Sequence, residues 1–249
     1  MVTGYATLRD VPATLDSKFR AALPRPTPAM RLVLTSDTHN QQRALRLPPG
    51  DVLVHAGDFT MRGTEPEVRA FGEWLGDQSY EHKVLIAGNH DFLFEREPRL
   101  ARSLLPADVH YLFDSEVSLG GLRFWGAPWQ PWFLDWAFNL RRGPELAARW
   151  ALIPEGIDVL ITHGPPMGTA DRTVHGEDVG CADLAEAMKR VKPRLSVFGH
   201  IHEGYGLYGD KANVAICDEK YRLVNQPVVV DLAPGGGPPV FVTNRWKDP

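Results

Sequence analysis

The sequence predicts a single α/β domain, and three observations support this prediction. From Arg31 onward, short apolar runs alternate with polar turns and longer amphipathic stretches, as expected for strands and helices that alternate along the chain. Five of these runs lead directly into clusters of polar residues. Hydrophobic residues make up 43% of the 249 residues, which is enough to bury a substantial core. We therefore expect one domain over residues 31–249.

The first 30 residues differ from the rest of the chain. They are rich in Ala, Pro and Thr, show little periodicity, and end near a run punctuated by three prolines at residues 24, 26 and 28. Such composition does not predict regular structure. We expect residues 1–30 to form an extension that packs over the domain or is partly disordered.

Short apolar runs, each followed within two residues by glycine or a polar residue, predict six strands. They are residues 32–35, 52–55, 83–87, 122–125, 159–162 and 195–198. Apolar residues at helical spacing predict helices at residues 65–75 and 182–191, with Pro66 tolerated near the start of the first and Pro193 closing the second. A shorter helix is expected at residues 144–152. Beyond Gly204 the sequence predicts a strand at residues 228–232, followed by a turn-rich stretch at 234–239.

Polar side chains follow five of the predicted strands. These clusters are Asp37-Thr38-His39, Gly57-Asp58, Gly88-Asn89-His90-Asp91, Thr162-His163-Gly164 and Gly199-His200-Ile201-His202. Side chains at the carboxyl ends of neighbouring strands converge in one crevice, where open α/β sheets usually bind ligands. Two carboxylates, an amide oxygen and several imidazoles suit two adjacent divalent ions such as Mn, Fe or Zn. Metal pairs of this kind serve phosphate-ester hydrolysis.

Each cluster also has a structural interpretation. Asp37 and His39 are two residues apart and would share one face of an extended backbone, but an aspartate after a strand often forms only a local turn. Asp58 could likewise cap a helix. The glycine-containing clusters are more specific, because glycine lets the backbone turn sharply before the polar residues. The inference therefore rests on the occurrence of all five clusters together.

Four histidines lie outside the clusters and are interpreted as structural or surface residues. They are His55, His82, His110 and His175. His55 is near enough to Asp58 in sequence to support a ligand, although a core histidine is the preferred interpretation. Cys181 and Cys217 are too few to form a disulfide framework, so we expect two free, partly buried thiols.

Charge and hydropathy exclude several classes of partner. The formal net charge is −4 and no long Lys/Arg block is present, which argues against extended binding of nucleic acid or an anionic membrane. A small phosphorylated substrate remains compatible with this charge. No apolar run approaches the ~18 residues of a membrane span, and residues 1–30 lack the apolar centre of a signal peptide. The expectation is a soluble, cytoplasmic protein whose oligomeric state is left open.

Two groups of residues are candidates for substrate contacts. Residues 124–138 carry the aromatic side chains Trp125, Trp129, Trp132, Phe133, Trp136 and Phe138. Packing of an irregular loop onto the sheet is the preferred interpretation, with a minority of these rings available to stack on a nucleobase. Arg62, Arg141 and Arg142 are candidates for phosphate or ribose contacts, although solvated surface arginines are commoner.

The ordered set of five clusters resembles the signature of the calcineurin-like metallophosphoesterases over about residues 31–232. Residues 57–60, 125–133 and 199–206 are similar to the metallophosphoesterase-domain-containing proteins related to class III cyclic-nucleotide phosphodiesterases. The resemblance implies a layered sandwich of two mixed β-sheets flanked by helices. It also implies two divalent metal ions. Among Mn, Fe and Zn, Mn is expected to support activity best.

The resemblance further implies a role for each polar residue. The implied metal ligands are Asp37, His39 and His202 for one ion, Asn89, His163 and His200 for the other, and Asp58 as the bridge between them. His90 would stand beside the scissile phosphate, where an imidazole can protonate the leaving alkoxide or stabilise its developing charge. Asp91 would orient His90, or would alternatively cap the segment that follows it.

The predicted function is hydrolysis of phosphodiester bonds in a small substrate, with cyclic nucleotides as candidates. A phosphomonoesterase or a nuclease on the same site is an alternative, and the net acidity weighs against the nuclease. A nucleotide-binding regulator with little catalysis is the alternative from another class. The presence of His90, His200 and His202 favours an active enzyme.

Overall fold

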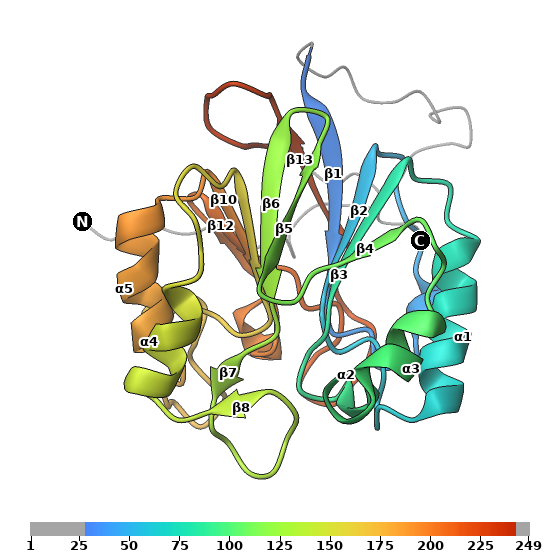
Figure 1. Cartoon of the computed structure of the whole chain (residues 1–249), viewed down its shortest axis with the longest axis horizontal. Coiled ribbons are helices and arrows are strands. Elements are labelled where there is room, and N and C mark those ends of the chain that lie inside the picture. The colour runs from blue at the N-terminus through green and yellow to red at the C-terminus, as the bar shows by residue number, and fades with distance from the viewer. Residues whose placement is uncertain (1–27, 243–249) are drawn as a thin grey trace.

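Two six-stranded β-sheets pack against each other and helices cover their outer faces, as the computed structural model shows (Figure 1). The structure describes residues 28–242. Residues 1–27 of the expected extension lie outside the described residues, and Met30 already belongs to the first strand. The layered sandwich of two mixed sheets flanked by helices confirms the expected fold. Within residues 28–242, no helix is long and apolar enough to cross a membrane.

The first sheet has the strand order β14-β13-β1-β2-β3-β4. Strands β1 to β4 are mutually parallel, β13 pairs antiparallel with β1, and β14 pairs antiparallel with β13. The bounds are β14 Val240–Val242, β13 Val228–Leu232, β1 Met30–Thr35, β2 Val52–Ala56, β3 His82–Ile86 and β4 Val109–Tyr111. The carboxyl ends of β1, β2 and β3 therefore lie at one edge of this sheet.

The second sheet has the order β11-β12-β10-β9-β6-β5. Its four central strands are parallel, and β11 and β5 are antiparallel edges. The bounds are β11 Gly206–Tyr208, β12 Lys211–Asn213, β10 Leu195–Phe198, β9 Val159–Thr162, β6 Leu122–Ala127 and β5 Ser115–Leu119. A separate two-residue pair joins β7 (Gln130–Pro131) to β8 (Asn139–Leu140).

Helices flank the sandwich on its two outer sides, with α4 and α5 on the left and α1 to α3 on the right of Figure 1. The bounds are α1 Glu65–Gly76, α2 Phe92–Arg96, α3 Pro98–Ser103, α4 Pro144–Trp150 and α5 Ala182–Val191, with 3-10 turns η1 Gln42–Ala44 and η2 His202–Gly204. Helix α1 begins with a capping box between Thr64 and Glu67, which satisfies backbone amides in its first turn.

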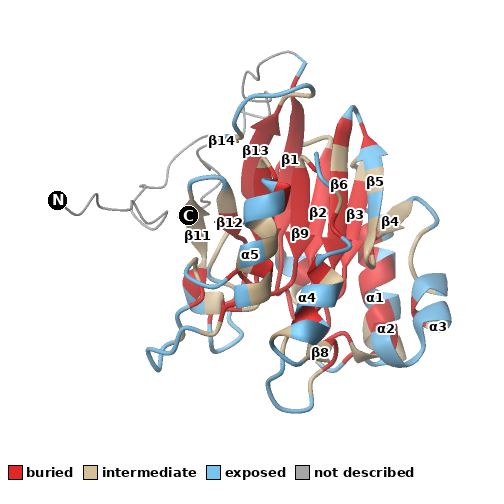
Figure 2. Ribbon diagram, turned by 60° about the vertical axis from the view of Figure 1, so that its left-hand side comes forward, coloured by how far each residue is buried: buried red, intermediate tan, exposed pale blue. Residues whose placement is uncertain are grey.

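The central strands are buried on both faces because alternate residues pack in opposite directions. Leu32 and Leu34 of β1 pack with Phe124 of β6 in the layer between the sheets. Val33 belongs to a second cluster, which also contains Phe71 of α1. Figure 2 shows the result as buried central strands and helices that are buried along one side. This rigid core supports the loops at the ends of the parallel strands.

The predicted strands and the three predicted helices are confirmed. The bounds match for residues 159–162, 182–191, 195–198 and 228–232. The ends of the other elements shift by one or two residues. The elements missed are short or lie at sheet edges. Strand β5, for example, has the sequence Ser-Glu-Val-Ser-Leu and exposes alternate side chains. Such segments carry too few apolar residues to stand out from loops.

Candidate metal centre

The five polar clusters meet at the carboxyl ends of β1, β2, β3, β9 and β10. The sequence therefore placed them correctly at one end of the sandwich. Seven of the nine candidate residues are buried, and His200 and His202 are half-buried. Three overlapping groups offer ligand atoms within 4.8 Å of one another: Asp37, His39 and His202; His39, Asp58 and His90; and Asp58, His163 and His200.

Asp58 belongs to two of these groups and lies at the middle of the centre. Its Oδ2 atom is 3.3 Å from His163 Nε2, 4.0 Å from His39 Nε2 and 3.9 Å from His90 Nε2. Its Oδ1 atom accepts a hydrogen bond of 2.8 Å from the backbone amide of His90. One carboxylate oxygen thus faces both halves of the centre while the other is held by the backbone.

The two halves have different donor sets. In one half, His202 Nε2 lies 3.3 Å from Asp37 Oδ1 and 3.3 Å from His39 Nε2. In the other half, the side-chain oxygen of Asn89 lies 2.9 Å from His163 Nε2. The structure therefore brings together all seven residues that the sequence predicts as ligands.

Four imidazoles of the centre have the same orientation. Each Nδ1 contacts a backbone carbonyl oxygen, at 3.3 Å for His39 and Thr60, 2.8 Å for His90 and Met61, 2.9 Å for His163 and Ala56, and 2.7 Å for His202 and Asp218. A carbonyl only accepts hydrogen bonds, so each Nδ1 carries a proton and donates it. Each Nε2 consequently faces the centre, which is the usual arrangement of metal-binding histidines.

The charges of the centre fit divalent cations. Burial raises the pKa of Asp58, but the neighbouring imidazoles, with His163 contributing most, together lower it well below its usual value. Burial likewise acts against ionisation of Asp37, and His202 lowers its pKa. Two ionised carboxylates are therefore buried close together, and buried charges require charged partners or metal ions.

The pKa values of the imidazoles shift in opposite directions beside these carboxylates. Although burial lowers the pKa of His163, Asp58 raises it to about 9, and Asp37 does the same for His202. Burial instead lowers the pKa of His39 to about 4 and that of His200 to about 3. Metal ions bind ionised carboxylates and neutral imidazoles, so His39 and His200 are already in the binding form, whereas His163 and His202 would each release a proton to a bound cation. With that exchange the donor set fits two divalent ions.

The backbone of the centre is strained. The φ angles of Asp37, His39, Asp58 and His200 are 54°, 41°, 56° and 66°. Residues other than glycine adopt this left-handed region at a cost, although aspartate and histidine do so more readily than most, and they remain there where the surrounding contacts hold them. A side chain at Gly199 would meet Asp37 Oδ2 at 1.9 Å, so only glycine fits before His200.

A sequence model described as calcineurin-like phosphoesterase matches residues 30–204 of this chain. The chain belongs to this family. The human and mouse proteins named Metallophosphoesterase domain-containing protein 1 are each 45% identical over 238 residues, which covers 84% of this chain and 73% of theirs. A UPF0046 protein of Caenorhabditis elegans is 42% identical and covers 82% of this chain and 60% of its own. Family membership indicates a hydrolase of phosphate esters that uses divalent metals.

Solved structures share the fold of this phosphoesterase. One aligns with a TM-score of 0.60 at 15% identity and covers 82% of this chain and 95% of its own. The protein TT1561 of Thermus thermophilus aligns with a TM-score of 0.53 at 14% identity, over 76% and 90% of the two chains. At these identities the similarity supports the architecture alone.

The expected role of Asp91 is wrong in its geometry. His90 Nδ1 is oriented by the carbonyl of Met61, not by Asp91. The Asp91 side chain does not cap α2 either. Its carboxylate instead accepts hydrogen bonds from the amides of Asp58, Thr60 and Gly88 and from the Thr60 hydroxyl, at 2.7–3.0 Å. Asp91 therefore clamps the two loops that carry Asp58 and Asn89.

Replacement of Asp91 by alanine is expected to destabilise the phosphoesterase. The variant leaves the buried amides of Asp58, Thr60 and Gly88 without their acceptor, and each unsatisfied buried group costs about 1–3 kcal/mol. The Thr60 hydroxyl can still donate to the carbonyl of His90. We expect the free energy of unfolding of the metal-free protein to fall by roughly 3 kcal/mol or more. Urea denaturation measures this change. Exposed Asp210 provides the control, since Asp210→Ala should stay within about 0.5 kcal/mol of wild type. A loss of under about 1 kcal/mol for Asp91→Ala contradicts the clamp.

The histidines outside the clusters are structural or surface residues, as predicted. His55 is 1% exposed, contacts the hydroxyl of Thr38 at 3.0 Å, and packs against Phe59 and Phe71. Burial lowers its pKa to about 3. His55 thus contacts the first polar cluster through Thr38. His82 and His110 are half-buried, and His175 is exposed.

Both cysteines are free, as expected, and both are fully buried rather than partly so. Cys217 Sγ accepts a hydrogen bond of 3.4 Å from Gln41. Burial raises the pKa of the Cys217 thiol to about 12, so it is not a reactive thiolate.

The candidate substrate-contacting residues divide into two groups. Trp125, Trp129 and Phe138 are buried as predicted, whereas Trp132 and Phe133 are 57% and 62% exposed, contrary to the packing interpretation. Those two rings belong to the loop between β7 and β8, which projects from the sandwich (Figure 1).

The three arginines also differ from one another. All three are exposed, and the difference lies in their contacts. The guanidinium of Arg142 donates to the carbonyls of Val179 and Gly180, so Arg142 holds a loop in place and is not free for phosphate.

Two neighbours of the centre were missed as site residues. The ring centroid of Trp136 is 4.2 Å from that of His90, and the ring centroid of Tyr221 is 4.8 Å from that of His39. Trp136 stood out only as one of several aromatic residues. Tyr221 lies in an irregular segment before β13 and belongs to no motif, so the sequence carried no signal for it.

Proposed function

We propose that this protein is a metal-dependent phosphodiesterase that acts on a small substrate. In this proposal Asp37, His39 and His202 hold one divalent ion, and Asn89, His163 and His200 hold the other. Asp58 would serve as a ligand to both ions. The observation that carries the proposal is the position of Asp58 Oδ2, which faces the imidazoles of both halves. Manganese is the ion we expect to support activity best.

The side chains of the centre prepare it for hydrolysis of a phosphate ester. When bound, a pair of divalent ions activates water and neutralises the charge that develops on the phosphoryl group. The backbone carbonyls of Thr60, Ala56 and Asp218 fix the imidazoles that hold the ions. Such fixed donors need little reorganisation during the reaction.

His90 is proposed as the proton donor to the leaving alkoxide. Its Nδ1 donates to the carbonyl of Met61, and its Nε2 lies 3.9 Å from Asp58 Oδ2 at the edge of the centre. Nε2 is thus the atom that can hold a proton and transfer it to the leaving oxygen. The hydrogen bond from the His90 amide to Asp58 ties the position of this imidazole to the centre.

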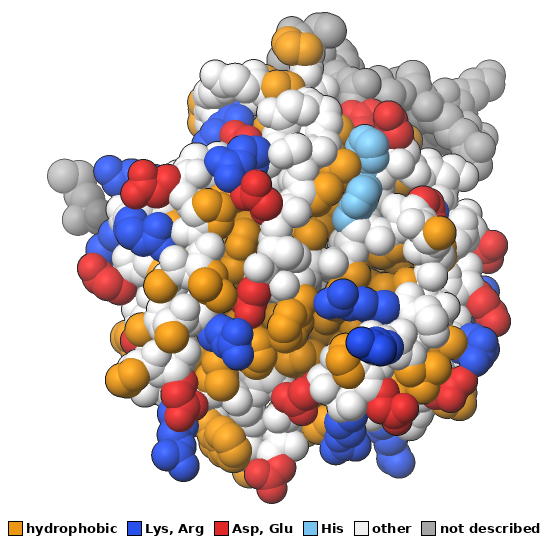
Figure 3. All heavy atoms as spheres, viewed as in Figure 1, with side chains coloured by type: hydrophobic (Ala, Val, Ile, Leu, Met, Phe, Trp, Pro, Cys, Tyr) orange, Lys and Arg blue, Asp and Glu red, His pale blue; other side chains and the backbone are white. Residues whose placement is uncertain are grey.

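A small phosphodiester, with cyclic nucleotides as candidates, fits the surroundings better than a polymer. Basic and acidic side chains are interspersed on the face shown in Figure 3. The net charge of −4 adds no general attraction for a polyanion. Aromatic rings near His90 offer surface for a nucleobase.

The test measures whether the manganese-loaded protein hydrolyses bis(4-nitrophenyl) phosphate, 4-nitrophenyl phosphate and a panel of cyclic nucleotides. We expect hydrolysis of the diester and of at least one cyclic nucleotide. An Asp58→Ala preparation serves as the control for contaminating phosphatases. Turnover of the monoester alone would make the protein a phosphomonoesterase. No turnover with two ions bound would favour a nucleotide-binding regulator.

A further inference from the structure

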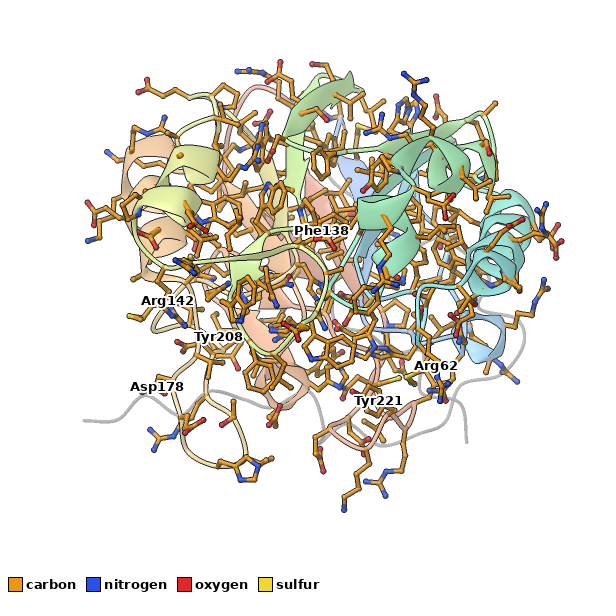
Figure 4. All side chains as sticks on the ribbon, turned by 60° about the horizontal axis from the view of Figure 1, so that its bottom comes forward. Arg62, Phe138, Arg142, Asp178, Tyr208 and Tyr221 are labelled. Atoms are coloured by element: carbon orange, nitrogen blue, oxygen red, sulfur yellow. The ribbon has the colours of Figure 1, made fainter. Side chains whose placement is uncertain are left out.

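Two aromatic side chains outside the predicted ligand set border His90. The indole of Trp136 lies against the imidazole, with ring centroids 4.2 Å apart and planes inclined by 34°. The ring of Tyr221 lies 5.9 Å from that of His90 and 4.8 Å from that of His39. It is also 5.7 Å from the ring of His202, so Tyr221 caps three imidazoles of the centre. Figure 4 shows the position of Tyr221 at this end of the molecule.

These two aromatic rings present surface to solvent where His39 and His90 do not. Tyr221 is 40% exposed and Trp136 is half-buried, whereas His39 and His90 are 2% and 6% exposed. An organic group attached to the phosphate next to His90 therefore meets Trp136 and Tyr221 before it meets bulk water.

The position of Tyr221 is fixed by its backbone. Its carbonyl accepts a hydrogen bond of 2.7 Å from Gln41 Nε2, and its amide donates to the carbonyl of Asp218 at 2.9 Å. The same Asp218 carbonyl orients His202. Tyr221 has a φ angle of 57°, which is unfavourable for a bulky side chain and persists only where neighbouring contacts hold it.

Trp136 is fixed in a different way. The next residue, Ala137, donates its amide to the carbonyl of Asn89 at 3.2 Å, and the amide of Phe138 donates to Glu95 at 2.6 Å. The indole also stacks on Phe92, with planes inclined by 30°. The loop between β7 and β8 is thereby attached to the strand-end cluster that carries His90.

We propose that Trp136 and Tyr221 form an aromatic rim that binds a planar aromatic group attached to the scissile phosphate. This inference rests on the proposed function, in which the leaving oxygen lies beside His90. Aromatic side chains bind planar rings by stacking or edge-to-face contact, and they gain less from a small alkyl group. The rim thus selects phosphate esters that carry an aryl or heteroaryl group near phosphorus.

Binding of three product-like anions tests the rim without any turnover. Titration calorimetry on the manganese-loaded protein compares phenyl phosphate, methyl phosphate and inorganic phosphate. Wild type is expected to bind phenyl phosphate about tenfold more tightly than methyl phosphate, since one stacked ring contributes on this order. Tyr221→Ala and Trp136→Ala are each expected to reduce this preference by about fivefold. Their affinity for inorganic phosphate should change by less than about twofold.

Two further variants separate contact with the substrate from support of the fold. Trp136→Phe keeps a ring beside His90 and should retain most of the preference. Trp132→Ala is the matched control, because Trp132 lies in the same loop and is 57% exposed. It should behave as wild type. Metal content is measured for every variant, so that loss of an ion is not mistaken for loss of the rim.

The outcomes distinguish the rim from the proposed function. An unchanged preference in both alanine variants, or an absent preference in wild type, overturns the rim. An equal loss of affinity for all three anions also overturns it, because the residues would then only support the metal centre. A full preference for phenyl phosphate with no turnover of bis(4-nitrophenyl) phosphate supports the rim and contradicts the proposed hydrolysis.

Discussion

Replacement of Asp58 by alanine is expected to remove both metal ions and abolish phosphoesterase activity. The Oδ2 atom faces His163 on one side and His39 on the other, so both metal positions lose the same carboxylate. Without Asp58, His163 loses the carboxylate that acts on it most strongly and keeps the more weakly acting Asp37. We expect activity to fall at least about a thousandfold, because bound metals supply several kcal/mol of transition-state stabilisation.

Elemental analysis by mass spectrometry measures the metal content of the Asp58→Ala variant, and circular dichroism checks its fold. The control is Asp210→Ala, which removes an exposed carboxylate away from the centre. The control should bind two ions and keep full activity. Two tightly bound ions in Asp58→Ala would refute the bridging role.

Replacement of His90 by alanine is expected to lower turnover while both ions remain bound. General acid catalysis contributes about 10²–10⁴-fold, and His90 Nε2 is the proposed donor. The loss should be largest for substrates with an alkoxide leaving group. It should be smaller for bis(4-nitrophenyl) phosphate, because 4-nitrophenolate leaves readily without a proton. The measurement is kcat on both kinds of substrate, together with metal content.

The metal content of His90→Ala distinguishes a proton donor from a metal ligand. His90 forms one of the three potential ligand groups with His39 and Asp58, so its geometry also permits metal binding. Loss of an ion from His90→Ala would make His90 a ligand and contradict the proposed role. Full activity with both ions bound would remove His90 from the mechanism altogether.

Much of the centre could be predicted from the sequence because its side chains follow the central parallel strands. Residues after β1, β2 and β3 must meet at one edge of the sheet, so Asp37, Asp58 and Asn89 converge. The groups that orient the imidazoles could not be predicted. Every residue has a backbone carbonyl, so the sequence does not mark that of Met61 as the partner of His90, and its position depends on how the loops pack.

The role of Asp91 was mispredicted for a similar reason. Its place beside His90 in sequence suggested a partner for that imidazole, but the side chain points to the amides of Thr60 and Gly88. Adjacent residues often point in different directions, and a local motif does not reveal which direction is chosen. The pairing of β13 with β1 was equally hidden, because these strands are far apart in the chain.

The most direct test of the two-metal centre is a crystal structure of the manganese-loaded protein with anomalous scattering. We expect two peaks about 3.5–4 Å apart, a separation typical of two-metal sites, with Asp58 Oδ2 between them. One ion should contact Asp37, His39 and His202. The other should contact Asn89, His163 and His200. A single peak, or two peaks that do not share Asp58, would contradict the account.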